Sequence, residues 1–376
     1  VVAGAANITG GATFTGTGTT FLQGDVHLTG SANATAGKMM VSGGVFTADA
    51  PAEVVGTLNW TGGTIGSNLT VPAGSLFVVS GPDAKVFGGG ATLDNYGTTR
   101  WTGGHAIQVY ENVTINNHLD GRFEIGTDGT PFIDYYGGNV FNNNGLFTKN
   151  GGAGGLAILQ EMTFNFNGEL NCDNGTIRLD SRSNLAAGST ITGTGAVHHN
   201  GDVHVLGPCT ETIADLRLTA GTLTAAAPGA FVGTLSWDLG TIKGVLGVPS
   251  GSLLEVVGEL EHYLGIDAVL NVDGTLRWLG PDPLRGYERC TVNILPGGVF
   301  DVAADGVLLE DYYTPNTLNI EGQLVKSGGT ETSSVQFWTI HATGDIACDT
   351  GILSLAAITH LEGGCGFSGS GTTTSG

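Results

Sequence analysis

The chain has 376 residues, of which 40% are hydrophobic, 12% are charged and 65 are glycine, so it carries enough apolar material for a core and is not a disordered chain. Its 13 Lys and Arg residues against 34 Asp and Glu residues give a net charge of −21, a shortage of cations that excludes nucleic acid and anionic membrane surfaces as expected partners. No apolar run approaches the roughly 20 residues that span a bilayer, so no membrane insertion is expected.

The sequence repeats itself once, at the offset that separates Gly24 from Gly201. Cys172 and Cys348 lie one residue out of this register, late in the repeat. Long tandem units are typical of stacked architectures rather than of a single active site. The matching segments are Thr15–Gly18 with Thr192–Gly195, Gly24–His27 with Gly201–His204, Gly56–Trp60 with Gly233–Trp237, and Asp134–Tyr136 with Asp311–Tyr313. The predicted organisation is a partial terminal coil (1–13), a first repeat (14–190), a second repeat (191–367), and the start of a third repeat or an exchange strand (368–376).

Within each repeat, glycines precede short segments in which apolar and polar residues alternate. The second residue after each glycine is apolar, with Thr99 as the exception. This period of two predicts strands with one buried face, and neighbouring Asn, Asp and Gly residues supply the turns between them. The glycines are Gly44, Gly74, Gly97, Gly121, Gly145 and Gly168, followed by Gly221, Gly251, Gly274, Gly298, Gly322 and Gly344.

The absence of any sustained apolar stripe at helical spacing argues against helices, and each glycine would cost a helix interior about 1 kcal/mol. A propeller blade needs about 40–50 residues and a sandwich predicts hairpin turns about every 8–12 residues, so neither alternative fits the glycine spacing. The sequence therefore predicts an all-β fold, a parallel β-helix (β-solenoid) with about seven coils in each of the two tandem repeats.

The five cysteines show no metal-binding or redox spacing. Cys172 and Cys348 fall on the inward phase of their segments, and Cys348 with Cys365 is a candidate disulfide between neighbouring coils. Six N-glycosylation sequons all lie in the first repeat, and their use would require an extracellular setting. The sequon residues are Asn7, Asn33, Asn59, Asn68, Asn112 and Asn174.

Two duplicated polar clusters are the candidate sites. Asp25 with His27, and Asp202 with His204, place a carboxylate and an imidazole on one face of a strand, as a metal or general-base site would require. Their presence in both repeats favours hydrogen bonding between coils instead, so neither a metal nor any other cofactor is expected.

The second cluster contains Glu310, Asp311, Tyr312 and Tyr313, where carboxylates lie beside aromatic rings that can bind sugars. In a β-helix glycosidase or lyase, Asp311, Glu310 and Tyr312 would be the catalytic candidates. The alternative is a solvent-facing loop whose tyrosines pack on the coils. We favour that alternative because the first repeat has the same Asp-Tyr-Tyr sequence, and the chain is predicted not to be an enzyme.

The strands of the form Gly-Thr-Leu-x-Trp, at Gly56–Trp60 and Gly233–Trp237, combine with Asn/Asp-Gly turns and short Thr/Gly coils over the whole chain. This pattern resembles the secreted β-helical repeat proteins of microbial surfaces, such as autotransporter passengers and filamentous-haemagglutinin-like adhesins. The resemblance implies an extracellular or cell-surface structural or adhesive role, and it carries no functional residues across.

The predicted function is an extracellular structural β-solenoid, a filament subunit, surface fibre or adhesin stalk. Val1 falls inside the last coil of a repeat and Gly376 inside the first coil of another, which predicts end-to-end association with further copies or a segment of a longer array. Surface polysaccharide is the second expected partner. Two alternatives stay open: a polysaccharide-acting enzyme, and an ice- or crystal-surface binder using the Thr-x-Thr pairs Thr15/Thr17, Thr17/Thr19, Thr192/Thr194 and Thr372/Thr374.

Overall fold

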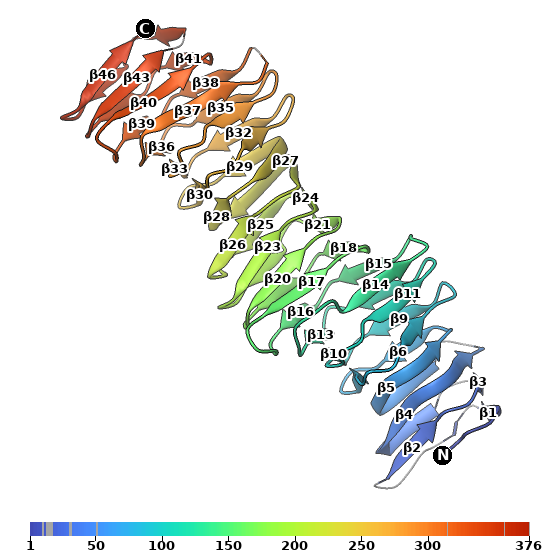
Figure 1. Ribbon diagram of the computed structural model, residues 1–376. Coiled ribbons are helices and arrows are strands. Elements are labelled where there is room, and N and C mark those ends of the chain that lie inside the picture. The colour runs from blue at the N-terminus through green and yellow to red at the C-terminus, as the bar shows by residue number, and fades with distance from the viewer. Residues whose placement is uncertain are drawn as a thin grey trace. The chain divides into compact units, whose positions relative to one another are not determined.

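A computed structural model describes residues 1–9, 11–12, 18–29, 32–49, 52–313, 315–356 and 358–375, without the side chains of 32–38, 52, 54, 227 and 228. These residues form parallel strands stacked in successive coils, a parallel β-solenoid of about 16 turns (Figure 1). The described residues contain no helix, and hence none that could cross a membrane. The chain divides into unit 1 (1–184 and 189–197) and unit 2 (185–188 and 198–376).

Unit 1 has three faces of parallel strands, and its long strands β4 and β5 each contribute to more than one face. Face A consists of β2 (Thr19–Leu22), β4 (Ala32–Ala48), β5 (Ala52–Ile65), β7 (Leu76–Val79), β10 (Thr98–Trp101), β13 (Arg122–Ile125), β16 (Leu146–Lys149), β19 (Glu169–Cys172) and β22 (Thr190–Thr192). Face B consists of β1 (Ala6–Thr9), β3 (Val26–Thr29), parts of β4 and β5, β8 (Lys85–Phe87), β11 (Ile107–Tyr110), β14 (Phe132–Tyr135), β17 (Leu156–Leu159) and β20 (Thr176–Leu179). Face C consists of parts of β4 and β5, β6 (Leu69–Val71), β9 (Thr92–Asn95), β12 (Thr114–Asn117), β15 (Val140–Asn143), β18 (Thr163–Phe166) and β21 (Ser183–Leu185).

Unit 2 has three equivalent faces, labelled by their match to unit 1 in the sequence repeat, and β23 (Ala196–His199) lies where the chain divides. Face A consists of β26 (Asp215–Leu218), β28 (Thr234–Trp237), β30 (Leu253–Val256), β33 (Thr275–Trp278), β36 (Val299–Val302), β39 (Gln323–Lys326), β42 (Asp345–Cys348) and β45 (Gly366–Ser368). Face B consists of β24 (Asp202–Val205), β27 (Thr222–Val232), β29 (Gly240–Val248), β31 (His262–Leu264), β34 (Leu284–Gly286), β37 (Gly306–Asp311), β40 (Thr332–Gln336), β43 (Ile352–Ala356) and β46 (Thr372–Ser375). Face C consists of β25 (Pro208–Glu211), parts of β27 and β29, β32 (Val269–Val272), β35 (Thr291–Ile294), β38 (Thr317–Ile320), β41 (Thr339–Ala342) and β44 (Thr359–Leu361).

The core is made of apolar ladders that run from coil to coil. On face A of unit 2, Leu276, Phe300, Leu324 and Ile346 occupy the same register position in β33, β36, β39 and β42, and all four are buried. Each such side chain contributes about 1.5–3 kcal/mol when removed from water. The alternation of apolar and polar residues therefore corresponds to side chains that point into and out of each coil. The parallel β-helix prediction is confirmed.

The predicted number of about seven coils per repeat is too small, because some coils are shorter than the glycine spacing suggests. On face A of unit 1, Thr19 faces Lys38, Lys38 faces Thr57 and Thr57 faces Leu76, so three coils of equal length follow one another. The glycine spacing predicts two coils from Gly18 to Gly74, whereas the register shows three. Averaged over the chain, a coil has about 22 residues.

A column of glycines marks the corner between faces C and A, where successive backbones approach most closely. In unit 2 this column contains Gly298, Gly322 and Gly344. A Cβ added to these residues would lie 2.1, 2.3 and 2.0 Å from a carbonyl oxygen of the preceding coil, respectively. None of the three has a left-handed φ, so the close approach rather than the backbone conformation requires glycine.

The repeat extends to individual hydrogen bonds, each made inside its own unit. Trp60 Nε1 donates to Gly63 O at 3.3 Å, and Trp237 Nε1 donates to Gly240 O at 3.3 Å. The buried Lys149 ammonium lies 2.8 Å from Asp128, and the buried Lys326 ammonium lies 2.7 Å from Asp305. The matching pairs are related by the same offset as the sequence repeat, so the repeated sequence preserves the contacts that hold coils together.

The interior of unit 1 contains a ladder of buried asparagines that unit 2 lacks. Asn95 donates to Asn117 at 2.7 Å, and Asn117 donates to Asn143 at 2.7 Å, with all three fully buried at the ends of β9, β12 and β15. The same positions of unit 2 hold Val272, Ile294 and Ile320, which are also buried. The coil therefore accepts either an amide ladder or an apolar ladder at this place.

Replacing Asn117 alone with isoleucine is expected to lower the free energy of unfolding by about 1–3 kcal/mol, because Asn143 Oδ1 then loses its donor inside the coil. The triple change Asn95→Val, Asn117→Ile and Asn143→Ile reproduces the ladder of unit 2 and is expected to recover most of that loss. Urea unfolding of the two variants measures both effects. A triple variant less stable than the single one would contradict this explanation.

Candidate functional site

The most distinctive surface of the described residues is a group of tyrosines on face B of unit 2. We call Tyr263, Tyr287, Tyr312 and Tyr313 the tyrosine patch. Tyr263 lies in β31, Tyr287 follows β34, and Tyr312 and Tyr313 follow β37, so the patch crosses three coils. The ring centroids of Tyr287 and Tyr312 are 5.1 Å apart, close to the spacing of stacked parallel strands.

The parallel register also places charged residues in a row beside these rings. Tyr263 faces Arg285 across the ladder, and Arg285 faces Glu310. Arg285 lies 2.9 Å from Glu310 on one side and 3.0 Å from Glu261 on the other. The Tyr263 hydroxyl donates to Glu261, and this hydrogen bond to the carboxylate raises the pKa of Tyr263 to about 12. The arginine and both glutamates are thus held in fixed positions.

A second arginine, close by in the sequence, forms its own group of ion pairs. Arg289 Nε lies 2.6 Å from Asp267, and its Nη1 contacts Glu288 on the other side. The hydrogen bond from Arg289 lowers the pKa of Asp267. Arg285 with Glu261 and Glu310, and Arg289 with Asp267 and Glu288, are thus two groups of ion pairs, which we call together the row of ion pairs.

Asp311, the leading catalytic candidate, is held by hydrogen bonds that connect two neighbouring coils. Its Oδ1 accepts a hydrogen bond of 2.7 Å from Asn316, and Asn316 Oδ1 in turn accepts from the backbone N–H of Cys290 at 2.8 Å. Burial raises the pKa of Asp311, and the bond from Asn316 partly opposes that shift. Unit 1 repeats the device, with Asn139 bonded to Asp134 at 2.5 Å and to the Val113 N–H. Asp311 therefore fixes the turn that carries Tyr312 and Tyr313.

The sequence prediction named Glu310, Asp311 and Tyr312 as candidates, but it missed the groups that surround them. Arg285 and Tyr263 come from the two preceding coils, and only the register of the strands brings them to this surface. No local sequence motif indicates that Arg285 and Tyr263 belong to this site. The buried ion pairs of Lys149 and Lys326 were also missed, although both lysines and both partner aspartates are duplicated at the period of the repeat.

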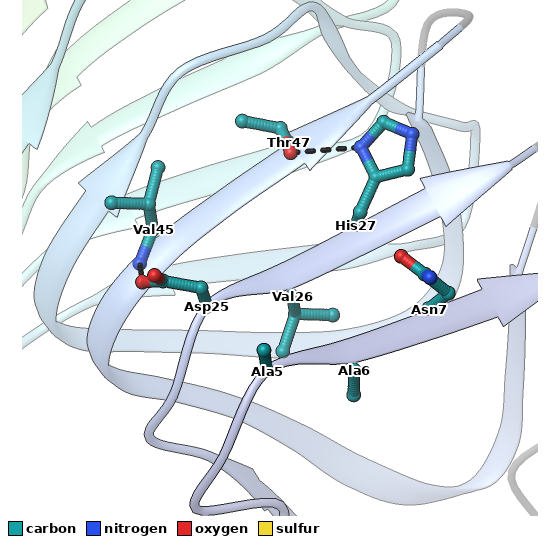
Figure 2. A pocket seen from close by; sticks show the side chains of 8 residues that line it. All are labelled: Ala5, Ala6, Asn7, Asp25, Val26, His27, Val45 and Thr47. Carbon is teal, nitrogen blue, oxygen red and sulfur yellow. Dashed lines mark hydrogen bonds between the residues drawn. The ribbon is translucent and has the colours of Figure 1, made fainter.

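The Asp-His pairs bond to neighbouring strands rather than converge on a common point. His27 Nδ1 is 2.9 Å from Thr47 Oγ1, and Asp25 accepts from the Val45 N–H at 3.0 Å (Figure 2). His27 Nε2 is 3.0 Å from Asp49. Asp25, His27, Val45 and Thr47 line a shallow pocket of about 310 Å³.

In unit 2 the corresponding pair is different, since His204 Nε2 bonds Asp202 directly at 3.0 Å. Within the described part of the chain, no group of three or more His, Cys, Asp and Glu side chains is arranged to hold a metal ion. The two pairs therefore share their sequence but not their contacts.

The candidate disulfide between Cys348 and Cys365 is not formed, and the register explains why. Asp345 faces Gly366, so Cys365 is level with the residue before Asp345, whereas Cys348 lies at the far end of the same strand. Two cysteines need Cα atoms within about 7 Å to be bridged. Cys348 and Cys365 are both free thiols, and Cys348 is buried as the sequence predicted.

Of the sequon residues, Asn7, Asn68 and Asn112 are exposed, and Asn59 and Asn174 are partly buried. Asn68 Oδ1 accepts from the Thr92 N–H at 2.8 Å, and Asn174 Nδ2 donates to Gly152 O at 3.2 Å. The Asn33 side chain lies outside the described part of the structure. Asn7 and Asn112 are thus the most accessible acceptors for a glycan.

The Thr-x-Thr pairs do not continue from coil to coil where the structure describes them. Thr19 faces Lys38, Thr192 faces Asn171, and Thr372 faces Ile352. Thr15 and Thr17 lie outside the described residues. A flat threonine array two residues wide is therefore not built by the described pairs.

These observations define the class of protein: an all-β parallel β-solenoid built from a duplicated unit, with a tyrosine patch on one face of unit 2. No protein-family model matches the chain, and no curated protein shows significant sequence similarity to it.

Proposed function

We propose that the chain is a non-enzymatic structural β-solenoid of the cell surface or extracellular space, a fibre subunit or adhesin stalk. The observation that carries this proposal is that an ion pair with a buried lysine recurs in both units at the same position. A catalytic group is needed once, whereas a group that holds coils together is needed in every unit. Lys149 with Asp128, and Lys326 with Asp305, are the clearest example.

The outer surface of face C supports the same proposal. In unit 2, Asn271, Asn293 and Asn319 form an amide ladder with bonds of 2.8 and 2.7 Å. Thr291 and Thr317 form a parallel column two positions away along the strands. A surface of small, uncharged side chains that bond to one another favours a scaffold over a catalytic groove.

Association of copies end to end belongs to this proposal. All strand pairings described within each unit are parallel and each coil adds to the ladder of the previous one, so a coil from a second copy can extend the same ladders. Electron microscopy and light scattering of the purified chain test this directly. Fibres are the expected result, and isolated particles at all concentrations would contradict it.

The experiment that tests the structural role is a turnover screen with acidic and neutral polysaccharides. The expected result is no cleavage. Asp311→Asn is the informative variant, because it keeps the shape of the side chain and removes its charge, and Asp134→Asn changes the equivalent residue of unit 1. Cleavage that is lost in Asp311→Asn and kept in Asp134→Asn would overturn the proposal in favour of a polysaccharide-acting enzyme.

A further inference from the structure

At the tyrosine patch the two units differ in chemistry while keeping the same strands. Unit 1 preserves three of the four tyrosines, as Tyr110, Tyr135 and Tyr136, and the rings of Tyr110 and Tyr135 stack at 4.8 Å. Six positions around the rings are charged or aromatic only in unit 2. They are Glu261, Tyr263, Asp267, Arg285, Arg289 and Glu310, in place of Ala84, Val86, Gly90, Gln108, Asn112 and Ile133.

Stability of the coils does not explain this difference. Unit 1 forms the same three strands β8, β11 and β14 without any of the six residues. The side chains of Arg289 and Asp267 are 50% and 62% exposed, and exposed ion pairs typically contribute about 0–1 kcal/mol. The added groups therefore point to a second role, which the shared tyrosines alone do not perform.

The patch offers two kinds of contact side by side. Tyr312 and Tyr313 are 53% and 59% exposed, so their rings present apolar surface to solvent. Beside them, Arg285, Glu261 and Glu310 present donors and acceptors that their ion pairs already hold in place. A fixed arrangement binds a ligand with less loss of side-chain entropy than a mobile one.

A pyranose ring complements both features. It has an apolar face of C–H groups that packs on an aromatic ring, and hydroxyls at its rim that donate to carboxylates and accept from guanidinium groups. A polyanion fits poorly because the row contains four carboxylates against two arginines. A cationic ligand fits poorly because each of these carboxylates already faces an arginine.

We propose that the tyrosine patch of unit 2, with its row of ion pairs, binds a neutral polysaccharide chain laid across the three coils of β31, β34 and β37. Tyr312 and Tyr313 supply the stacking surface, and Arg285 with Glu261 and Glu310 supplies the hydrogen bonds. This inference goes beyond the structural role and does not depend on it, because a scaffold without this activity would still fold and assemble.

The test is affinity gel electrophoresis of the full chain in gels that contain hydroxyethyl cellulose, xyloglucan or galactomannan, with polygalacturonate as the acidic comparison. At least one neutral polysaccharide is expected to slow migration, and polygalacturonate is not. Tyr312→Ala with Tyr313→Ala is expected to weaken binding about tenfold or more, as loss of aromatic anchors does.

The chain contains its own matched control. Tyr135→Ala with Tyr136→Ala removes the equivalent rings of unit 1 and is expected to leave binding unchanged. A further variant gives unit 2 the residues of unit 1, with Glu261→Ala, Tyr263→Val, Arg285→Gln and Glu310→Ile. It is expected to fold, because unit 1 folds with these residues, and to lose binding while keeping the three shared tyrosines.

Three results would each overturn the proposal. The first is that none of the neutral polysaccharides slows migration of the chain, and the second is that polygalacturonate alone slows it. The third is that the double alanine variants of the two tyrosine pairs, one in each unit, lose binding equally. Thermal unfolding of every variant separates a lost contact from a lost fold, and binding retained by a folded unit-1-like variant would likewise contradict the assigned role of the ion pairs.

Discussion

Replacing Gly322 with alanine is expected to destabilise unit 2 severely. A Cβ at this position would lie 2.3 Å from the carbonyl oxygen of Gly298 and 2.4 Å from that of Leu295. Both are backbone atoms, which cannot move away by a side-chain rotation. The strands on either side, β38 and β39, are fixed by ladders in both directions, so the strain spreads over several coils. We expect a loss of about 3 kcal/mol, at the upper end of the usual cost of overpacking, measured by urea unfolding.

Gly363→Ala is the control for this prediction. Gly363 lies in a turn of the same unit, has no left-handed φ, and has no atom within 4 Å of an added Cβ. A surface change of this kind is expected to alter the free energy of unfolding by less than about 0.5 kcal/mol. If the two alanine variants unfolded at the same urea concentration, close backbone contact would not be the reason for the glycine column.

Replacing Asp305 with asparagine is expected to produce the second large effect. The Lys326 ammonium is fully buried, with Asp305 at 2.7 Å, Gly328 O at 2.7 Å and Ser333 Oγ at 2.9 Å. Without the carboxylate, a buried charge loses its counter-ion. Removing one partner of a buried pair costs about 3–5 kcal/mol, and we expect about 3 because Asp305 itself is 28% exposed. Urea unfolding at pH 7 measures this loss.

The same pair predicts a pH dependence. The hydrogen bond from Lys326 lowers the pKa of Asp305 below its ordinary value of 3.8. A carboxyl group with a lowered pKa in the folded state stabilises the protein above the ordinary pKa, and that contribution is lost as the pH falls through the folded value. The wild-type chain is therefore expected to lose more stability below pH 4 than the Asp305→Asn chain does.

The double change Lys326→Met with Asp305→Asn is the control, because it removes both charges and leaves no unpaired ammonium in the coil. It is expected to be more stable than Asp305→Asn alone. If the double variant were the less stable of the two, loss of packing by the lysine stem rather than an unpaired charge would account for the effect.

The class of fold could be predicted from the sequence because apolar and polar residues alternate in each strand, with the apolar ones pointing into the coil and the polar ones pointing out. The number of coils could have been predicted too. Gly18, Gly37 and Gly56 are equally spaced, and each is followed by the first paired residue of a face A segment. The prediction passes over Gly37 and Gly56 and counts Gly44, which lies between the face A and face B parts of β4.

The residues that make up the site were less predictable, because they are brought together by the register between strands of neighbouring coils. The sequence around Glu310 and Tyr312 pointed to this loop, but nothing in it shows that Arg285 and Tyr263 lie level with Glu310 in the two preceding coils. The same limit explains the error over Cys348 and Cys365. The number of residues between them is close to the length of one coil. A disulfide, however, requires the two cysteines to lie at the same position along neighbouring strands, and the coil here is longer than the separation of the two cysteines in the sequence.

The buried amide ladder of unit 1 has a consequence for how the chain folds. Two units of similar sequence in one polypeptide risk pairing a coil of one with the equivalent coil of the other, a common failure of tandem repeats. Such a mispaired coil would place Asn117 against Val272 or Ile320 and remove one of its hydrogen bonds to a neighbouring asparagine, at a cost of about 1–3 kcal/mol for each such contact. The ladder thus distinguishes the coils of β9, β12 and β15 from their equivalents in unit 2, and it favours pairing of these coils with their own neighbours.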